Sequence, residues 1–177
     1  MKENSQTKIV ASQRPVLGLA VQDKCKDWPL SFCCPEDWKP REIRVENGIK
    51  FFLRGPLGQA EHLFPAITVR ARPGKGRILN GLSCEWVGRR SAFRTFRLLA
   101  RAEITVAGIE AMRLDAAHEM PASLDRPTSE TILVRERVIL VLQDEKAYEL
   151  TYRATQEDFE EHLPVFEALA ASFSLET

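Results

Sequence analysis

Hydrophobic and polar residues alternate along several short stretches of the chain, a period typical of β-strands with one buried face. In the first half, Ile67, Val69 and Ala71 alternate with polar residues. Two shorter apolar runs, at 30–34 and 49–53, are bounded by proline or glycine, which interrupt regular structure. Three strands are therefore predicted before residue 75.

The second half of the chain predicts two hairpins. Residues 102–106 and 112–116 alternate on either side of a turn at Gly108. Prolines predict a loop at 121–127, and a long apolar run at 131–143 is followed by an alternating stretch at 148–153. Within that run, 138–142 has no alternation, which is typical of a central strand covered on both faces. The sequence thus favours a mainly antiparallel sheet.

Two stretches repeat their apolar residues at helical spacing. The first, at 77–93, predicts a helix despite two glycines within it. The second, at 159–173, contains Pro164, and a proline inside a helix costs about 3 kcal/mol. We therefore expect a short turn from Gln156 and a main helix that starts at Pro164.

Length and charge limit the possible functions. The chain has 177 residues, 44% of them hydrophobic, and a polar start, which predicts a flexible arm at 1–15 and a single domain at 16–177. Its 25 basic and 25 acidic residues give no net charge, so nucleic acid is not an expected partner. No run is long enough to span a membrane, and no signal sequence is evident. A cytoplasmic location is predicted; a periplasmic or envelope location remains open if a leader has been removed.

Several local features occur together in a specific order. They are Phe32-Cys33-Cys34-Pro35-Glu36-Asp37-Trp38, Gly108 with Ala111, Tyr148-Glu149-Leu150-Thr151-Tyr152, Phe159, Pro164-Val165-Phe166 and Ser172-Phe173. In this order the chain resembles the PsbP-like superfamily over roughly residues 30–175. The superfamily includes PsbP of photosystem II, Mog-type Ran-binding factors, DcrB-like bacterial lipoproteins and cytoplasmic chaperones of type VI secretion effectors.

The resemblance implies an α+β fold, a three-layer α/β/α sandwich around a mainly antiparallel sheet. It also implies a non-enzymatic accessory or adaptor domain that binds another protein, with no catalytic residues to carry over. One alternative is a chaperone for type VI effectors, which requires an exposed concave apolar sheet face. Another is a binder or enzyme for a small anionic ligand, with Arg97 or Arg101 in a pocket between sheet and helix. Whether the protein is a monomer or a homodimer stays open.

Basic residues are concentrated in the middle of the chain. Residues 70–101 hold nine lysines and arginines and a single acid, Glu85, whereas the chain from Asp144 onward is acidic. We expect a docking face for an acidic protein partner at Arg89, Arg90, Arg94, Arg97 and Arg101. Strand parity predicts that Arg97 and Arg101 project from the same face. A solvated charged surface, or contact between the basic and acidic regions, is the alternative.

Histidine and serine patterns do not indicate a catalytic or metal site. His62, His118 and His162 lack metal-ligand spacing, and no serine lies in a nucleophile elbow. The glycines around Lys75 predict a tight turn, because the third glycine of a dinucleotide fingerprint is missing. No metal or cofactor is expected.

The four cysteines form no C-x-x-C motif and are predicted to be buried reduced thiols. Cys33 and Cys34 are adjacent in a predicted strand and should point to opposite faces. A disulfide involving Cys25 remains open if the protein is exported.

Overall fold

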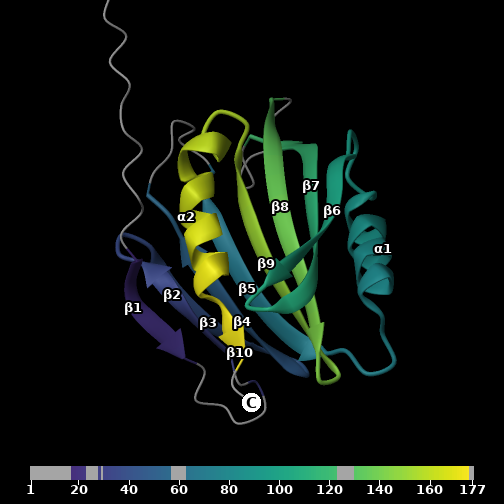
Figure 1. Ribbon diagram of the computed structural model, residues 1–177. Helices are drawn as coiled ribbons and strands as arrows, with labels where there is room; N and C mark the ends of the chain where they lie inside the picture. Colours follow the sequence, from purple (N-terminus) through teal and green to yellow (C-terminus); the bar gives the residue numbers. More distant parts are fainter. Residues whose placement is uncertain (1–16, 23–27, 29, 57–62, 123–129, 176–177) are drawn as a thin grey trace, which may run out of the picture.

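The computed structural model describes residues 17–22, 28, 30–56, 63–122 and 130–175. Seven antiparallel strands form the main sheet in the order β3-β4-β5-β9-β8-β7-β6 (Figure 1). These strands are β3 (Lys39–Val45), β4 (Gly48–Arg54), β5 (Ala66–Pro73), β6 (Arg97–Val106), β7 (Ile109–Pro121), β8 (Thr131–Gln143) and β9 (Lys146–Thr155). The strands β3 to β5 form one antiparallel meander, and β6 to β9 form a second. The two meanders join where β5 pairs with β9.

A second, smaller sheet packs beside the first. It consists of β1 (Leu17–Gln22), β2 (Leu30–Pro35) and β10 (Ser174–Leu175), in the order β1-β2-β10. The Phe32 ring of β2 meets the Phe51 ring of β4 edge-on, with centroids 5.5 Å apart. The small sheet therefore helps to cover one face of the large one.

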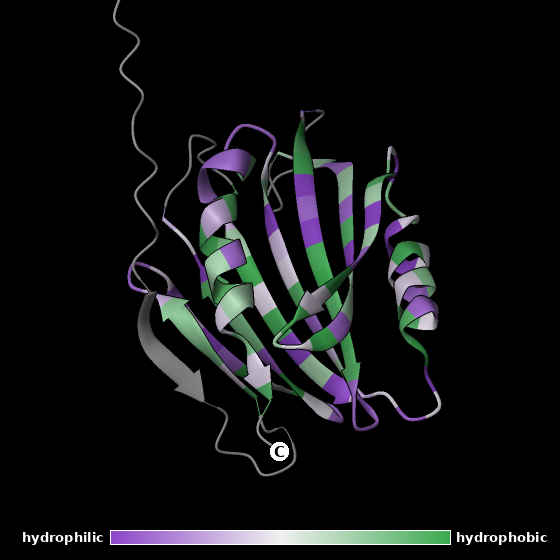
Figure 2. Ribbon diagram, viewed as in Figure 1, coloured by the Kyte–Doolittle hydropathy of each residue, from purple (hydrophilic) through white to green (hydrophobic). Residues whose placement is uncertain are grey.

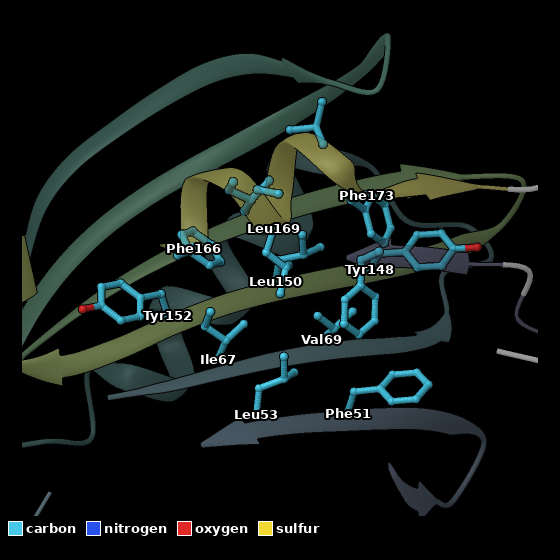
Figure 3. Close-up of a cluster of buried hydrophobic side chains, with 14 of the residues drawn as sticks. Phe51, Leu53, Ile67, Val69, Tyr148, Leu150, Tyr152, Phe166, Leu169 and Phe173 are labelled. Carbon is cyan, nitrogen blue, oxygen red and sulfur yellow. The ribbon is translucent and has the colours of Figure 1, made fainter. Parts of the chain in front are cut away.

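The helix α2 (Phe159–Ser172) packs on the same face beside the small sheet, and we call this the α2 face (Figure 1). Phe166 and Leu169 of α2 are fully buried, and Phe166 stacks on Tyr152 of β9 at 5.7 Å (Figure 3). Burying each such side chain stabilises the fold by about 1.5–3 kcal/mol. The Tyr152 hydroxyl also donates a hydrogen bond of 2.9 Å to the Phe159 carbonyl oxygen, at the start of the helix.

The opposite face of the main sheet, the α1 face, is covered in part by α1 (Leu79–Arg90), which packs on β7 and β8. Leu82 and Trp86 are buried in a cluster that includes Leu114 of β7 and Val138 of β8. In Figure 2, hydrophobic and hydrophilic residues alternate along many of the strands. The middle of β8 is an exception, because Val138 faces α1 while Ile139 belongs to the core under α2. The predicted central strand and three-layer sandwich are confirmed.

Some predicted elements differ from the structure. The sequence pattern did not predict β1, β3 or β10, and it placed the start of β6 at 102 instead of Arg97. The prediction for α2 was wrong: one helix runs from Phe159 through Pro164. The lost backbone hydrogen bond of Pro164 is outweighed because Phe159 is itself a fully buried anchor of the apolar stripe. The predicted arm at 1–15 lies outside the described residues.

Candidate functional site

The helix α1 covers only part of its face of the sheet. It packs on β7 and β8, while the same face of β4, β5 and β9 is polar and borders an open cleft of about 300 Å³. We call this the arginine cleft. Its lining is Lys50, Phe52, Ala66, Thr68, Arg70, Arg89, Arg90, Glu136, Glu149, Thr151 and Arg153.

Two arginines of α1 bridge the helix to the sheet at the wall of this cleft. Arg89 Nη2 donates to Glu149 Oε2 of β9 at 3.0 Å. Arg90 Nε lies 2.9 Å from Glu136 Oε2 of β8, and the Glu136 side chain is only 1% exposed. Two of the five arginines predicted to bind a partner are thus paired with carboxylates of the protein itself. At these positions the basic region and the acidic residues do face each other.

Two more arginines lie beside the same carboxylates on the sheet. Arg70 is the cross-strand neighbour of Glu149, and Arg153 is that of Glu136. In the part of the chain that the structure describes, neither Arg70 nor Arg153 forms an ion pair within 4.0 Å. Arg70 Nε is also buried without a hydrogen-bond partner. Each carboxylate is therefore paired with a helix arginine, and the strand arginine beside it leaves positive charge in excess.

The floor of the arginine cleft is poorly hydrated. Burial raises the pKa of Glu136, against the opposing effect of Arg90 and Arg153. Burial also lowers the pKa of Arg153, although the nearby Glu136 works in the other direction. Both shifts have the direction expected where water cannot solvate a charged group fully.

His118 of β7 lies next to this network but serves in packing. Its ring stacks on Phe93 at a centroid distance of 4.5 Å, and both ring nitrogens are buried without a hydrogen bond. Burial, followed by the charges of Arg90 and Arg153, lowers the pKa of His118 to about 4, so the ring is neutral at pH 7. Across the described residues, no three potential metal ligands come together.

The other three predicted arginines lie at or near the edge strand β6. Arg94 follows α1, and Arg97 and Arg101 are on β6; all three are exposed. Arg101 donates to Asn80 Oδ1 of α1. The prediction that Arg97 and Arg101 share a face was wrong, because the register shifts between Leu98 and Ala100. Arg97 pairs with Ala117 and Arg101 with Leu114, so the two side chains leave opposite faces.

Large apolar side chains are exposed among these arginines. Phe93 is 36% exposed, Leu98 41% and Leu99 49%. We call this surface, made of Phe93, Arg94, Arg97, Leu98, Leu99 and Arg101, the β6 edge. It combines apolar area with positive charge at the end of a sheet whose last strand has an unpaired side.

The cysteines follow the prediction only in part. Cys34 is buried, its Sγ lies 3.4 Å from the Trp38 carbonyl oxygen, and burial raises its pKa to about 11. Cys33 is half-buried, as expected for the opposite strand face, but Cys84 is exposed because it lies on the outer side of α1. Cys25 lies outside the described residues.

Sequence analysis did not single out the sheet residues of the arginine cleft. Thr68 on β5 and Thr151 on β9 were interpreted only as polar strand positions, and Arg70, Glu149 and Arg153 also only as members of the basic and acidic regions. One sequence signal could have identified this site: the polar positions of β5 and β9 together carry both basic and acidic side chains. Their pairing across the long interval between β5 and β9 is visible only in the fold.

No protein-family model matches the sequence, and no curated protein matches it. Solved structures do match. The cyanobacterial PsbP protein, CyanoP, of Synechocystis sp. PCC 6803 superposes with a TM-score of 0.63 at 12% identity, over 89% of this chain and 92% of that one. The chain has a PsbP-like fold.

Other PsbP-like structures support the same fold. LpqN of Mycobacterium tuberculosis, involved in cell envelope biogenesis, gives a TM-score of 0.58 at 12% identity and covers 90% of both chains. The Ran-binding protein Mog1p of Saccharomyces cerevisiae gives 0.57 at 8% identity, over 90% of this chain and 96% of that one. These identities establish the fold alone. Neither helix described in this PsbP-like domain is long and apolar enough to cross a bilayer.

Proposed function

We propose that this PsbP-like domain is a non-enzymatic accessory or adaptor domain that binds an acidic protein partner through the β6 edge. The observation that carries the proposal is the exposure of Leu98 and Leu99 between the cationic side chains of Arg97 and Arg101. Exposed apolar area rimmed by charge is typical of interaction surfaces. The Ran-binding activity of Mog1p is consistent with protein binding on this fold.

The backbone of β6 adds a second contribution. Within the part of the chain that the structure describes, β6 is paired on one side, with β7, so its other side can accept a strand from a partner. Among the described residues, the opposite edge, β3, contains Pro40, which lacks an N–H to donate, and exposes no large apolar side chain. An extended acidic segment would therefore be bound at β6 in preference to β3.

The arginines at this edge have different roles in the proposal. Arg94 and Arg97 make no ion pair within the described residues, and Arg101 contacts only the neutral Asn80. Their charge is available to attract an acidic partner and speed its association. Arg89 and Arg90 hold α1 in place, so we assign the direct contacts to Arg94, Arg97 and Arg101.

A chaperone for apolar helices receives less support. A chaperone would bind an apolar helix of its client on an exposed apolar sheet face. The uncovered part of the α1 face instead carries the charged residues Lys50, Arg70, Glu149 and Arg153. Laying an apolar helix there would remove these charges from water without providing partners, which is costly. An adaptor that uses the β6 edge avoids this cost.

The test is site-specific photo-crosslinking in native cell extract. A photoreactive residue at Leu98 should capture one defined acidic protein, and the same residue at Arg41 on β3 should not. Combining Leu98 labelling with Arg94→Glu, Arg97→Glu and Arg101→Glu should remove the crosslink, since charge reversal repels an acidic partner. The proposal fails if Leu98 and Arg41 capture the same proteins, or if charge reversal in a folded variant leaves the crosslink unchanged.

A further inference from the structure

We infer that the arginine cleft is a binding site for the phosphate group of a small molecule, separate from the β6 edge. The cleft is formed by α1 on one side and by β4, β5, β8 and β9 on the other. Its volume of about 300 Å³ lies at the small end of ligand sites, which fits a compact phosphorylated compound.

The balance of charge in the cleft favours an anion. Among the described residues, its cations are Lys50, Arg70, Arg89, Arg90 and Arg153, and its carboxylates are Glu136 and Glu149. The carboxylates are already engaged, Glu149 by Arg89 and Glu136 by Arg90. Of the remaining cations, Arg153 lies opposite Ala66 in the β5–β9 ladder, while Lys50 and Arg70 are direct cross-strand neighbours on β4 and β5. Without a ligand, these like charges repel each other in a poorly hydrated site.

The donors come from two layers of the fold. Arg89 and Arg90 reach in from the helix, and Arg70 and Arg153 rise from the sheet below. Between the two sheet arginines, Thr68 and Thr151 are cross-strand partners that both line the cleft, and the Thr151 hydroxyl donates to Glu149 Oε1 at 3.5 Å. Donors that approach from several directions match the tetrahedral oxygens of phosphate. A planar carboxylate is better matched by a single coplanar arginine fork.

Unsatisfied donors indicate where the ligand would be held. Arg70 Nε is buried and has no acceptor, although buried donors in proteins are nearly always hydrogen-bonded. Arg153 is partly buried and has no carboxylate within 4.0 Å among the described residues, yet it lies opposite Glu136 in the ladder. Phosphate oxygens would give acceptors to both guanidinium groups. Arg70 and Arg153 are therefore the residues that the inference assigns to direct ligand contact.

Calorimetric titration of the full chain with inorganic phosphate tests the site, with malonate as a dianion made of two planar carboxylates and chloride as an ionic-strength control. We expect saturable phosphate binding that malonate competes with at least tenfold more weakly. Arg153→Gln should weaken phosphate binding at least tenfold, while Arg94→Gln, at the β6 edge, should leave it unchanged. Circular dichroism checks that each variant is folded.

Arg70→Lys keeps the charge but removes Nε and the guanidinium fork, so it remains informative if Arg153→Gln does not fold. It should also weaken phosphate binding, and the Arg70 Nε–H resonance of the unaltered protein should shift on phosphate addition. The inference is overturned if binding is not saturable, if Arg94→Gln weakens it as much as Arg70→Lys, or if malonate binds as tightly as phosphate.

Discussion

Arg90 of α1 pairs with the buried Glu136 of β8, with 2.9 Å between Nε and Oε2, and this contact fixes the helix to the centre of the sheet. The arginine itself is 26% exposed, whereas the carboxylate is almost fully buried. The same guanidinium group lies 5.4 Å from the Trp86 ring centre, a cation–π distance. Arg90 therefore contacts both Trp86, in the apolar cluster under α1, and Glu136, in the lining of the arginine cleft.

Replacing Arg90 by methionine should destabilise the protein at pH 7 by about 2 kcal/mol, because a buried carboxylate loses its nearest counter-charge. Arg94→Met is the matched control and should change stability by less than about 0.5 kcal/mol. The stability loss of Arg90→Met relative to Arg94→Met should become smaller as the solution is made acidic. The raised pKa of Glu136 lets its carboxyl group take up a proton there, and the neutral group no longer needs a counter-charge. Urea unfolding at two pH values measures this, and equal effects of the two substitutions would contradict it.

Gly48, at the start of β4, should not tolerate a side chain. A Cβ there would lie 2.3 Å from the Ala71 carbonyl oxygen of β5, a backbone atom that cannot rotate away. Gly48→Ala should therefore destabilise the protein by about 1–3 kcal/mol. Gly88→Ala in α1 meets nothing within 4 Å and should stabilise by up to about 1 kcal/mol through helix propensity. Thermal unfolding of the two variants should shift the midpoint in opposite directions.

His118 should make stability depend on pH. Its pKa of about 4 in the folded protein is lower than its ordinary value of 6.5, so the unfolded chain binds the extra proton first. The stabilisation is complete above pH 6.5 and is lost as the pH falls toward 4, by up to about 3 kcal/mol.

His118→Phe keeps the stacking on Phe93 and should flatten this dependence between pH 6.5 and 4. Glu136 titrates with the opposite sign, because a raised carboxyl pKa favours the folded state as the pH falls. The comparison is therefore best made in a Glu136→Gln background. A pH profile that is the same with histidine and with phenylalanine would rule out this role.

Tyr152→Phe isolates one hydrogen bond at the start of α2. The phenylalanine ring can keep the stacking on Phe159 and Phe166, whereas the 2.9 Å bond to the Phe159 carbonyl oxygen is lost. We expect a loss of about 1 kcal/mol, the usual net value of such a bond. Hydrogen exchange should speed up in the first turn of α2 more than in α1, and uniform acceleration would contradict a local role.

Local pattern was enough to predict most of the sheet. The hairpins around Gly108 and Asp144, and the covered strand at 138–142, follow from alternation, its absence and turn chemistry. β3 was missed because Pro40 and several charges interrupt it, as is usual for an edge strand whose outer side needs no partner. The order of the elements resembled a PsbP-like chain, which the fold confirms.

The surfaces were harder to predict than the fold. The bulge near Leu99 moves Arg97 to the other face, yet 98–100 is a plain apolar run with no glycine to mark it. The arginine cleft depends on α1 lying over β7 and β8, so that β4 and β5 stay open beside it. That placement is set by packing around Trp86 between distant elements, which local periodicity does not contain.

The junction between the two meanders has a consequence for the order in which the chain folds. Within β6 to β9, every pairing joins strands that are neighbours in sequence, and such local contacts close with little loss of chain entropy. The β5–β9 ladder instead joins Val69 to Leu150, with α1 and three strands between them. Within β3 to β5, every pairing likewise joins sequence neighbours, so we expect both meanders to form before this seam closes and the rate-limiting barrier to lie at the seam. The arginine cleft straddles the same seam and is completed only when folding ends.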